Sequence, residues 1–270
     1  MAHKIILIRP ENIYNYNNYP ALNLILIGSS LRAAGYDVKV INCAFEKDNM
    51  QTIKSELSGA LFVGISLLTS EAPESFIIMK FIKENSVVPV VVGGWHCTLF
   101  SEQMAECEYV DHVVAGEGEE HVVAIAESLS RGSPVNSKIF KKKFIDLESL
   151  SMPDYSIDRD IERFISSYLT DKLSEAAVQP MRWLPYESSR GCPSQCTFCI
   201  NVVTDNTQFR KKSAKKVITE IEYIVKKYRL THLKIIDDNF FVDINRVREI
   251  CEGIINRGLN ITWDGECRCD

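Results

Sequence analysis

Short apolar segments that alternate with helical segments are the feature that most restricts how this chain of 270 residues can fold. Each segment is apolar almost without interruption, which is typical of strands in a parallel sheet covered by helices on both faces. The pattern predicts strands at residues 4–8, 37–41, 61–66, 89–93 and 112–115, separated by helices at 22–34, 49–58, 74–85 and 119–129. We therefore expect an α/β domain with a doubly wound, Rossmann-like parallel sheet over residues 1–135.

Small and polar residues gather where the third, fourth and fifth of these strands end. Ligands of doubly wound sheets lie beyond the carboxyl ends of the strands, and glycine there lets a bulky ligand approach the backbone. Tight turns between a strand and a helix also use glycine, so both explanations stay open. The residues concerned are Ser66 and Thr69, Gly93 and Gly94, and Gly116, Glu117 and Gly118.

A second set of strand and helix patterns begins after a stretch of different character. We interpret residues 136–184 as a linker with an extended segment at 150–155 and a helix at 157–173. Residues 185–270 form a second domain of repeated strand–helix units, a pattern that fits part of a (β/α) barrel with its chemistry at the carboxyl ends of the strands. The basic run at 210–216 is interpreted as a solvated loop and helix start. Strands are predicted at 185–190, 232–236 and 261–263, and helices at 214–228 and 243–257.

Three cysteines with the spacing C-x3-C-x2-C follow the first strand of this second domain: Cys192, Cys196 and Cys199. Three neighbouring thiolates can hold three irons of a four-iron, four-sulfur (4Fe-4S) cluster and leave the fourth iron without a protein ligand. A structural zinc site usually has four ligands, commonly in two pairs, and no second pair with zinc spacing follows. Disulfides are disfavoured because nine cysteines is an odd number in a chain without a secretory signal pattern.

With Phe198 directly before the last cysteine, the loop resembles the signature of the radical S-adenosylmethionine (SAM) superfamily. The first half of the chain looks like the cobalamin-binding domain found at the N-terminus of B12-dependent radical SAM proteins. The matching stretches are residues 31–38, 63–69, 91–96 and 110–119. The resemblance implies a cobalamin-binding domain followed by the first part of a radical SAM (β/α) barrel.

The resemblance also assigns ligands to residues of both domains. It implies that the three cysteines carry the 4Fe-4S cluster and that the small and polar strand-end residues of the first domain contact cobalamin. Asp237 and Asp238 would contact SAM, or instead form the turn and cap before the next helix. Cys267 and Cys269 receive no role, and no catalytic acid, base or nucleophile is assigned. The complete set of implied SAM contacts is Phe198, Asp237, Asp238, Glu266 and Arg268.

One departure from the B12 domains concerns the loop after the first strand. Domains of the methionine-synthase type carry Asp-x-His-x-x-Gly there, with a histidine that ligates cobalt, whereas residues 9–20 contain no histidine. The resemblance therefore implies that cobalamin would lack a histidine ligand from this loop. His96 is a conceivable substitute, but a lone loop histidine is more often a surface or hydrogen-bonded residue.

The implied activity is reductive cleavage of SAM to methionine and a 5′-deoxyadenosyl radical, which takes hydrogen from an unactivated C–H bond. Methylcobalamin would then methylate a small-molecule or peptide substrate, although relatives also perform cyclisations. Flavodoxin or ferredoxin is the expected electron donor. Two alternatives stay open: a cobalamin-free radical SAM enzyme whose first domain serves recognition or dimerisation, and a cofactor-binding protein without catalysis.

Charge and hydropathy narrow the expected partners. The formal net charge of −5 argues against general nucleic-acid binding, which requires a basic surface. No apolar stretch reaches the length of a membrane span, and the apolar start is too short for a secretory signal, so we expect a cytoplasmic protein. The chain supplies three barrel strands, fewer than a radical SAM barrel contains. We therefore expect a homo-oligomer or a completing second chain, and no turnover by the isolated monomer.

Overall fold

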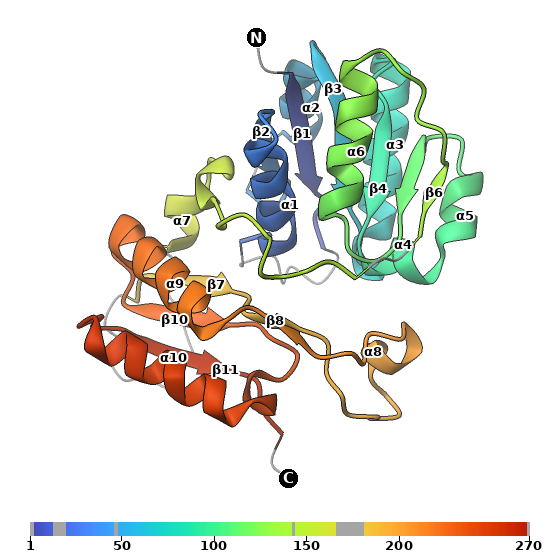
Figure 1. Cartoon of the computed structure of the whole chain (residues 1–270). Coiled ribbons are helices and arrows are strands. Elements are labelled where there is room, and N and C mark those ends of the chain that lie inside the picture. The colour runs from blue at the N-terminus through green and yellow to red at the C-terminus, as the bar shows by residue number, and fades with distance from the viewer. Residues whose placement is uncertain (1–2, 13–19, 46–47, 142–143, 166–180, 269–270) are drawn as a thin grey trace, which may run out of the picture. The chain divides into compact units, whose positions relative to one another are not determined.

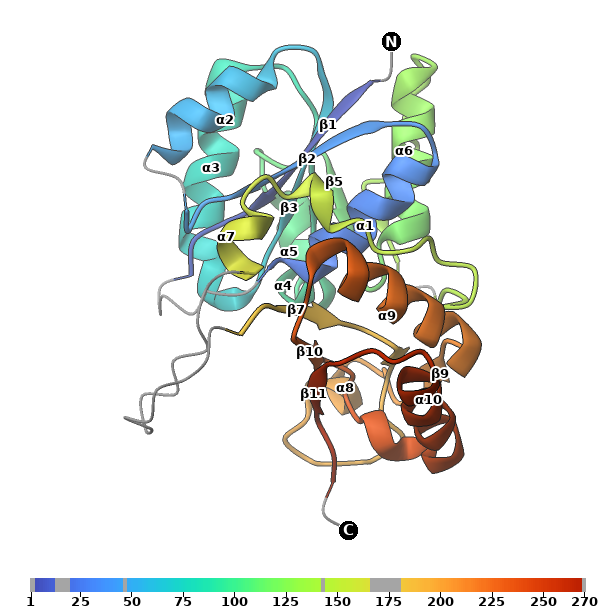
Figure 2. The ribbon, with the colours of Figure 1, turned by 90° about the vertical axis from the view of Figure 1, so that its left-hand side faces the viewer.

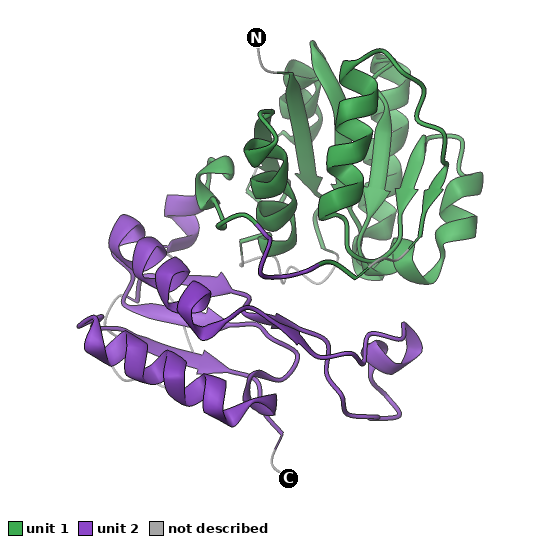
Figure 3. Ribbon diagram, in the orientation of Figure 1, with its two compact units in different colours: residues 1–145, 151–160 green, residues 146–150, 161–270 purple. Residues whose placement is uncertain are grey.

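The computed structural model describes residues 3–12, 20–45, 48–141, 144–165 and 181–268. It divides into two compact units, which Figure 3 shows in different colours. Unit 1 comprises residues 1–145 and 151–160, and unit 2 comprises residues 146–150 and 161–270, so the backbone passes between the units three times. No helix in the described ranges is long and apolar enough to cross a membrane.

Unit 1 is built on a six-stranded parallel sheet with the order β2-β1-β3-β4-β5-β6 (Figure 1). The inner strand β1 carries Ile5, Ile6, Leu7 and Ile8 in succession, and all four side chains are buried. Such a strand is stable only where helices cover both faces of the sheet, as the sequence pattern predicts. The strands are β1 (Lys4–Arg9), β2 (Asp37–Asn42), β3 (Ala60–Ser66), β4 (Val90–Gly93), β5 (His112–Val114) and β6 (Ile139–Phe140).

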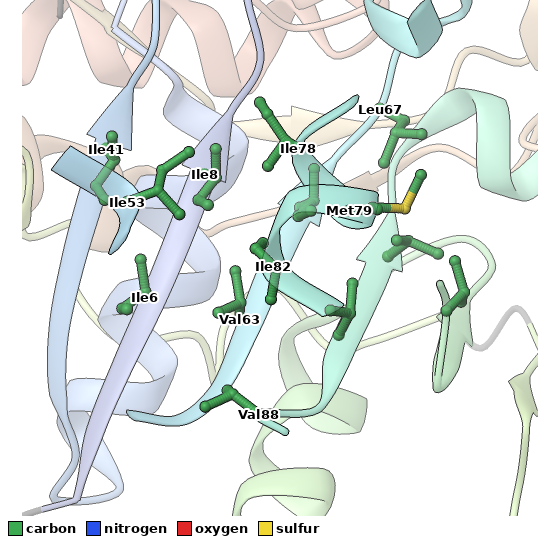
Figure 4. Packing of buried hydrophobic residues seen from close by; sticks show 14 of the residues in the cluster. Ile6, Ile8, Ile41, Ile53, Val63, Leu67, Ile78, Met79, Ile82 and Val88 are labelled. Atoms are coloured by element: carbon green, nitrogen blue, oxygen red, sulfur yellow. The ribbon is translucent and has the colours of Figure 1, made fainter. Parts of the chain in front are cut away.

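Helices cover both faces of this sheet (Figure 2). One face carries α1 (Leu22–Ala33) and α6 (Glu119–Ser130), and the other carries α2 (Asn49–Leu57) and α3 (Ala72–Asn85). A hydrophobic core lies between the sheet and the second pair: alternate strand residues such as Ile6 and Val63 pack with Ile53 of α2 and Ile78 of α3 (Figure 4). A 3-10 turn, η1 (Thr69–Glu71), precedes α3, and the short helices α4 (Trp95–Leu99) and α5 (Ser101–Glu106) follow β4.

Part of the predicted linker 136–184 belongs to unit 1. Strand β6 completes the sheet, and the 3-10 turn η2 (Tyr155–Ile157) buries both of its end residues. Asp154, just before η2, accepts a hydrogen bond from Arg32 Nη1 at 2.6 Å and donates its own N–H to Ser29 Oγ at 2.8 Å, which fastens the segment to α1. The helix predicted at 157–173 starts later than expected: α7 spans Ile161–Ile165, and residues 166–180 lie outside the described ranges.

Unit 2 contains a three-stranded parallel sheet with the order β11-β10-β7. Helices α9 (Ala214–Tyr228) and α10 (Ile244–Asn256) lie side by side on one face of this sheet (Figure 1 and Figure 2). Helix α9, predicted at 214–228, buries an apolar stripe formed by Val217, Ile221, Ile224 and Val225. The strands are β7 (Trp183–Tyr186), β10 (His232–Ile235) and β11 (Thr262–Gly265).

The strand predicted at 185–190 is in fact two separate strands. β7 ends at Tyr186, and β8 (Ser189–Arg190) pairs antiparallel with β9 (Arg210–Lys211) in a different, two-stranded sheet. The break occurs at Ser188, whose N–H and hydroxyl both donate to Asp237, at 2.6 and 2.5 Å, instead of continuing the β7 ladder. Pro185 is tolerated within β7 because, among the described strands, β7 lies at the edge of its sheet.

Candidate functional site

The three cysteines predicted to hold a cluster lie on one loop between β8 and the short helix α8 (Ile200–Val203). Cys192 is buried, Cys196 and Cys199 are half-buried, and all three are free thiols. The loop turns back on itself, with the Cys199 N–H donating to the Cys196 carbonyl at 3.0 Å. Phe198 is 90% exposed, so its ring does not pack over the thiols.

Gly191 sets the path of the backbone into this loop. Its φ is +80°, and a Cβ on it would lie 2.3 Å from the Gln208 carbonyl oxygen and 3.0 Å from that of Asn206. Only glycine combines this conformation with such a close approach to another stretch of backbone. The Gly191 N–H donates to Asp238 Oδ2 at 2.9 Å, and the Cys192 N–H to the Asn206 carbonyl at 3.4 Å. The first cysteine is thus held between the end of β10 and the returning segment.

Asp237 forms a clamp on the entrance to the loop, which we call the Asp237 clamp (Asp237, Ser188 and Ser189). The Asp237 carboxylate is 1% exposed and accepts from the Ser188 N–H and from the hydroxyls of Ser188 and Ser189, at 2.5 to 2.6 Å. This buried arrangement differs from the predicted SAM contact. It also differs from the alternative of a helix cap, because α10 is capped by Asp243, whose Oδ1 accepts from the Arg246 N–H at 3.1 Å.

A buried polar network supports the same region. Arg246, which is 4% exposed, donates to the carbonyls of Ser188 and Lys212, both at 2.8 Å. Burial lowers the pKa of Arg246, and the nearby Asp237 carboxylate opposes that shift. The guanidinium therefore holds the break after β7 against the start of α9.

The basic run 210–216 is expected to be solvated, but Lys212 within it is fully buried. Its Nζ donates to Glu220 Oε2 at 2.8 Å, and the same oxygen accepts from the Tyr186 hydroxyl at 2.6 Å. Glu220 is the signal that sequence reasoning overlooked. It lies three residues after Val217 and therefore on the apolar stripe of α9, where a carboxylate requires a partner.

A cavity of about 530 Å³ opens beside the cysteine loop, at the carboxyl ends of β10 and β11. Arg268 lines it and donates Nη1 to Cys196 Sγ at 2.9 Å, so this predicted residue touches both cavity and thiol. Glu266 has an exposed side chain, and its carbonyl accepts from the Phe240 N–H at 3.0 Å. Cys267, to which the sequence assigns no role, also lines the cavity. The other lining residues are Pro193, Ser194, Asn239, Phe241, Val242 and Ile244.

The thiols of the loop fit a 4Fe-4S cluster by their chemistry. They are free and lie within residues 192–199, and cysteine thiolates are the usual ligands of such clusters. Among the described residues, no three His, Cys, Asp or Glu side chains converge as they would around a single metal ion. A cubane does not require that convergence, because each cysteine binds a different iron. Cys192, Cys196 and Cys199 are therefore the residues that would hold it.

In unit 1 the predicted ligand contacts lie where the parallel strands end. The strand order changes direction at β1 and β3, and doubly wound sheets bind ligands in the crevice at such a switch point. Ser66 ends β3, and its hydroxyl accepts from Asn23 Nδ2 at 2.6 Å. Thr69 Oγ1 lies 3.1 Å from His96 Nδ1, so His96 is a hydrogen-bonded residue, as the simpler interpretation has it. Residues 13–19 of the loop after β1 lie outside the described ranges.

The two glycines after β4 have different surroundings. Gly94 has a φ of +96°, and a Cβ on it would lie 2.7 Å from the Leu67 carbonyl oxygen, so the protein's own backbone requires glycine there. A Cβ on Gly93 would have the Val114 carbonyl oxygen as its nearest neighbour, at 3.5 Å, which is an ordinary contact. Packing within unit 1 thus does not explain glycine at 93, and an approaching ligand would.

The segment after β5 is fixed by local hydrogen bonds. The Gly116 N–H donates to Thr98 Oγ1 at 2.9 Å, and Glu117 Oε2 accepts from the Ile145 N–H at 2.9 Å. Glu117 therefore fastens the chain beyond β6, a structural contact that differs from its predicted contact with cobalamin. Gly118 is the N-cap residue of α6, and a Cβ on it would lie 3.2 Å from Ile27 of α1.

Buried charges lie near the carboxyl end of β1. Arg9 Nε is 3.8 Å from Glu71 Oε1, and burial lowers the pKa of Arg9 and raises that of Glu71. Burial also raises the pKa of Asp158 to about 6.

Small residues lie at the strand ends of unit 1, beside hydroxyl and amide groups such as those of Ser66 and Asn23. Such residues suit a large ligand rich in amides, so this edge of the sheet fits cobalamin by its chemistry.

Comparison with known proteins finds a family match within unit 1 and relatives that align with nearly the whole chain. Residues 14–126 match the B12 binding domain family. The chain is 27% identical over 254 residues to an uncharacterized methyltransferase of Pyrococcus horikoshii, covering 92% of this chain and 55% of that protein. It is 26% identical over 260 residues to the anaerobic magnesium-protoporphyrin IX monomethyl ester cyclase of Synechocystis sp., covering 93% and 52%. The chain thus spans about half the length of these curated relatives.

Solved structures show the same fold. The cobalamin-dependent SAM radical enzyme OxsB, with aqua-cobalamin bound, superposes with a TM-score of 0.77 at 19% identity, over 97% of this chain and 38% of OxsB. The radical SAM methyltransferase TsrM from Kitasatospora setae, with cobalamin and a 4Fe-4S cluster bound, gives a TM-score of 0.68 at 16% identity, over 95% and 51%. Residues 14–126 thus match the B12 binding domain family, and nearly the whole chain is similar to a methyltransferase and to anaerobic cyclases and has the fold of OxsB and TsrM.

Proposed function

We propose that this chain is the cobalamin-binding and cluster-binding part of a radical SAM enzyme that transfers a methyl group to an unactivated carbon. The observation that carries the proposal is the loop with three free thiols beside a cavity at the carboxyl ends of a parallel sheet. In strand–helix barrels this end of the sheet is where the chemistry takes place. Because the chain spans about half of its curated relatives, the substrate and the complete activity belong to the proposal.

The residues of unit 2 have separate roles in this proposal. When bound, the cluster supplies the electron that cleaves SAM, and cobalamin supplies the methyl group. The Asp237 clamp and Arg246 fix the start of the cysteine loop, so the thiols do not have to be ordered when the cluster binds. Phe241 and Val242 contribute apolar side chains to the wall of the cavity.

The SAM contacts that we retain are on the loop edge of unit 2. Asp238 is exposed and accepts a hydrogen bond from the Gly191 N–H through Oδ2, which leaves carboxylate oxygen surface for an ammonium or a ribose hydroxyl. Phe198, Glu266 and Arg268 stay in the proposal as SAM contacts from the resemblance. In unit 1, Ser66, Thr69 and Gly93 are the proposed contacts to cobalamin, together with Gly94 and Gly116.

Cyclisation is the second candidate. The matches to the anaerobic magnesium-protoporphyrin IX monomethyl ester cyclases cover 91 to 93% of this chain, as complete a match as that to the methyltransferase. Both reactions would use the same cluster and SAM site. They differ in the fate of the substrate carbon, and therefore in whether a methyl group from SAM appears in the product.

The test is anaerobic reconstitution of the whole chain with iron, sulfide and hydroxocobalamin, followed by absorption spectra and an assay for 5′-deoxyadenosine. We expect Cys196→Ala to lose the cluster absorption and to keep the corrin bands, because the two groups are bound by different units. Cys251→Ala is the matched control: Cys251 lies on α10, outside the loop, and should change neither spectrum. Loss of the corrin bands with an intact cluster in Cys196→Ala, or zinc instead of iron in the wild type, would refute the proposal.

A further inference from the structure

Arg268 makes a contact that a role in SAM binding does not require. Its Nη1 donates to Cys196 Sγ at 2.9 Å across 72 residues of sequence. The segment that carries it is fixed to the chain after β10 by the hydrogen bond from the Phe240 N–H to the Glu266 carbonyl at 3.0 Å. This backbone hydrogen bond joins the residues after β11 to η3 (Phe240–Val242), and it sets the position from which the guanidinium reaches the thiol.

This contact distinguishes Cys196 from the other two cysteines. Among the described residues, no side chain donates a hydrogen bond to the sulfur of Cys192 or Cys199. Arginine is always charged and keeps its N–H donors at every relevant pH. A cation and a hydrogen bond on a cluster sulfur stabilise the more negative, reduced state, since net charge and hydrogen bonds to sulfur set the potential of iron–sulfur clusters.

We propose that Arg268 is a positioning residue that donates to the Cys196 sulfur in the cluster-bound protein and raises the reduction potential of the cluster. The inference rests on the proposed function, because it needs the cluster on these cysteines. It is distinct from a SAM contact, because the effect is present before SAM binds. Arg268 thereby makes it easier for a weak reductant to load the electron that SAM cleavage consumes.

The test measures the cluster potential of the whole chain in the absence of SAM and substrate. Wild type, Arg268→Met, Arg268→Lys and Arg248→Met are reconstituted anaerobically, and iron and sulfide contents are determined first. The reduced cluster is then followed by electron paramagnetic resonance during a mediated reductive titration. Arg248 is the matched control, because it is an exposed arginine of α10 that bonds Asn245 of its own helix.

We expect the midpoint of Arg268→Met to be more negative than that of the wild type. At the potential that half-reduces the wild type, the ratio of reduced to oxidised cluster should fall about tenfold, which corresponds to about 59 mV for one electron. Arg268→Lys keeps the charge and a donor and should lie between the two. Arg248→Met should match the wild type.

The outcomes separate the inference from the proposed function. A wild-type chain that binds no cluster refutes the proposed function itself. If all proteins bind the cluster and Arg268→Met keeps the wild-type midpoint, the inference is wrong and the proposed function stands. The inference would also be wrong if Arg268→Met changed only the affinity for SAM and left the midpoint potential unchanged. If Arg268→Met fails to retain iron, Arg268→Lys decides, since its midpoint must lie below that of the wild type.

Discussion

Replacing Asp237 by asparagine tests whether the Asp237 clamp holds the cysteine loop. Asparagine keeps the shape, and its Oδ1 still accepts from the Ser188 N–H, while the two serine hydroxyls can rotate to accept from the new amide. The number of hydrogen bonds is therefore preserved, and only their charge is lost. Charge-assisted hydrogen bonds contribute about 1 kcal/mol more than neutral ones, so three of them account for about 3 kcal/mol.

The loss also weakens the electrostatic support of Arg246, which is 4% exposed. Asp237 is the largest of the nearby charges that oppose the lowering of the Arg246 pKa by burial. We expect Asp237→Asn to lower the free energy of unfolding of unit 2 by about 3 kcal/mol.

Urea unfolding and hydrogen exchange measure this effect. With a denaturant slope of about 2 kcal/mol/M, the urea midpoint should fall by about 1.5 M. Peptides that cover Ser188 to Cys192 should exchange faster under native conditions. The control is Asp264→Asn, because Asp264 is half-exposed and pairs with His232 at 2.7 Å, a surface contact worth about 0–1 kcal/mol. A loss below 1 kcal/mol in Asp237→Asn, with unchanged exchange in the loop, would show that the clamp does not hold it.

Two further predictions concern unit 1. Gly94→Ala should lower the free energy of unfolding of unit 1 by about 2–4 kcal/mol in urea titrations, because the φ of +96° and the Leu67 carbonyl oxygen 2.7 Å from the new Cβ both oppose a side chain. The control Gly132→Ala, with a φ of +66° and open space around it, should cost only about 1 kcal/mol. Equal losses in the two variants would refute the reasoning. Asp158 has a folded pKa of about 6, above its unfolded value of 3.8, so the folded state binds more protons and stability falls as the pH rises from about 4 to 6. Asp158→Asn should flatten that part of the profile and stabilise unit 1 at pH 7 by up to about 3 kcal/mol, and a variant less stable than the wild type at pH 7 would contradict it.

The elements that could be predicted are those whose pattern lies within one element. Four successive apolar residues identify β1, and Val217, Ile221, Ile224 and Val225 identify α9, because period and burial coincide there. The cysteine loop could be found for a similar reason, since its spacing is local. The fold class and the position of the thiols therefore follow from neighbouring residues alone.

The rest depends on contacts between distant segments. Nothing near Asp237 shows that it meets Ser188, 49 residues earlier, and so the end of β7 and the burial of Asp237 could not be predicted. The predicted solvation of Lys212 was wrong for the same reason, because its partner Glu220 lies on the next helix. Gly94 illustrates the ambiguity of glycine: the sequence suits a ligand or a turn, and only the position of Leu67 decides.

The interleaved connection between the units makes it hard to divide this protein into halves. A cut after residue 145 would separate Asp154 from Arg32 and Ser29, to which it is bonded. A cut after residue 160 would take Glu148 away from Ser213, whose N–H and hydroxyl donate to it at 2.7 and 2.8 Å at the start of α9. Either cut therefore leaves one of the two halves without a piece that the other half encodes, and mixing the two halves should restore it.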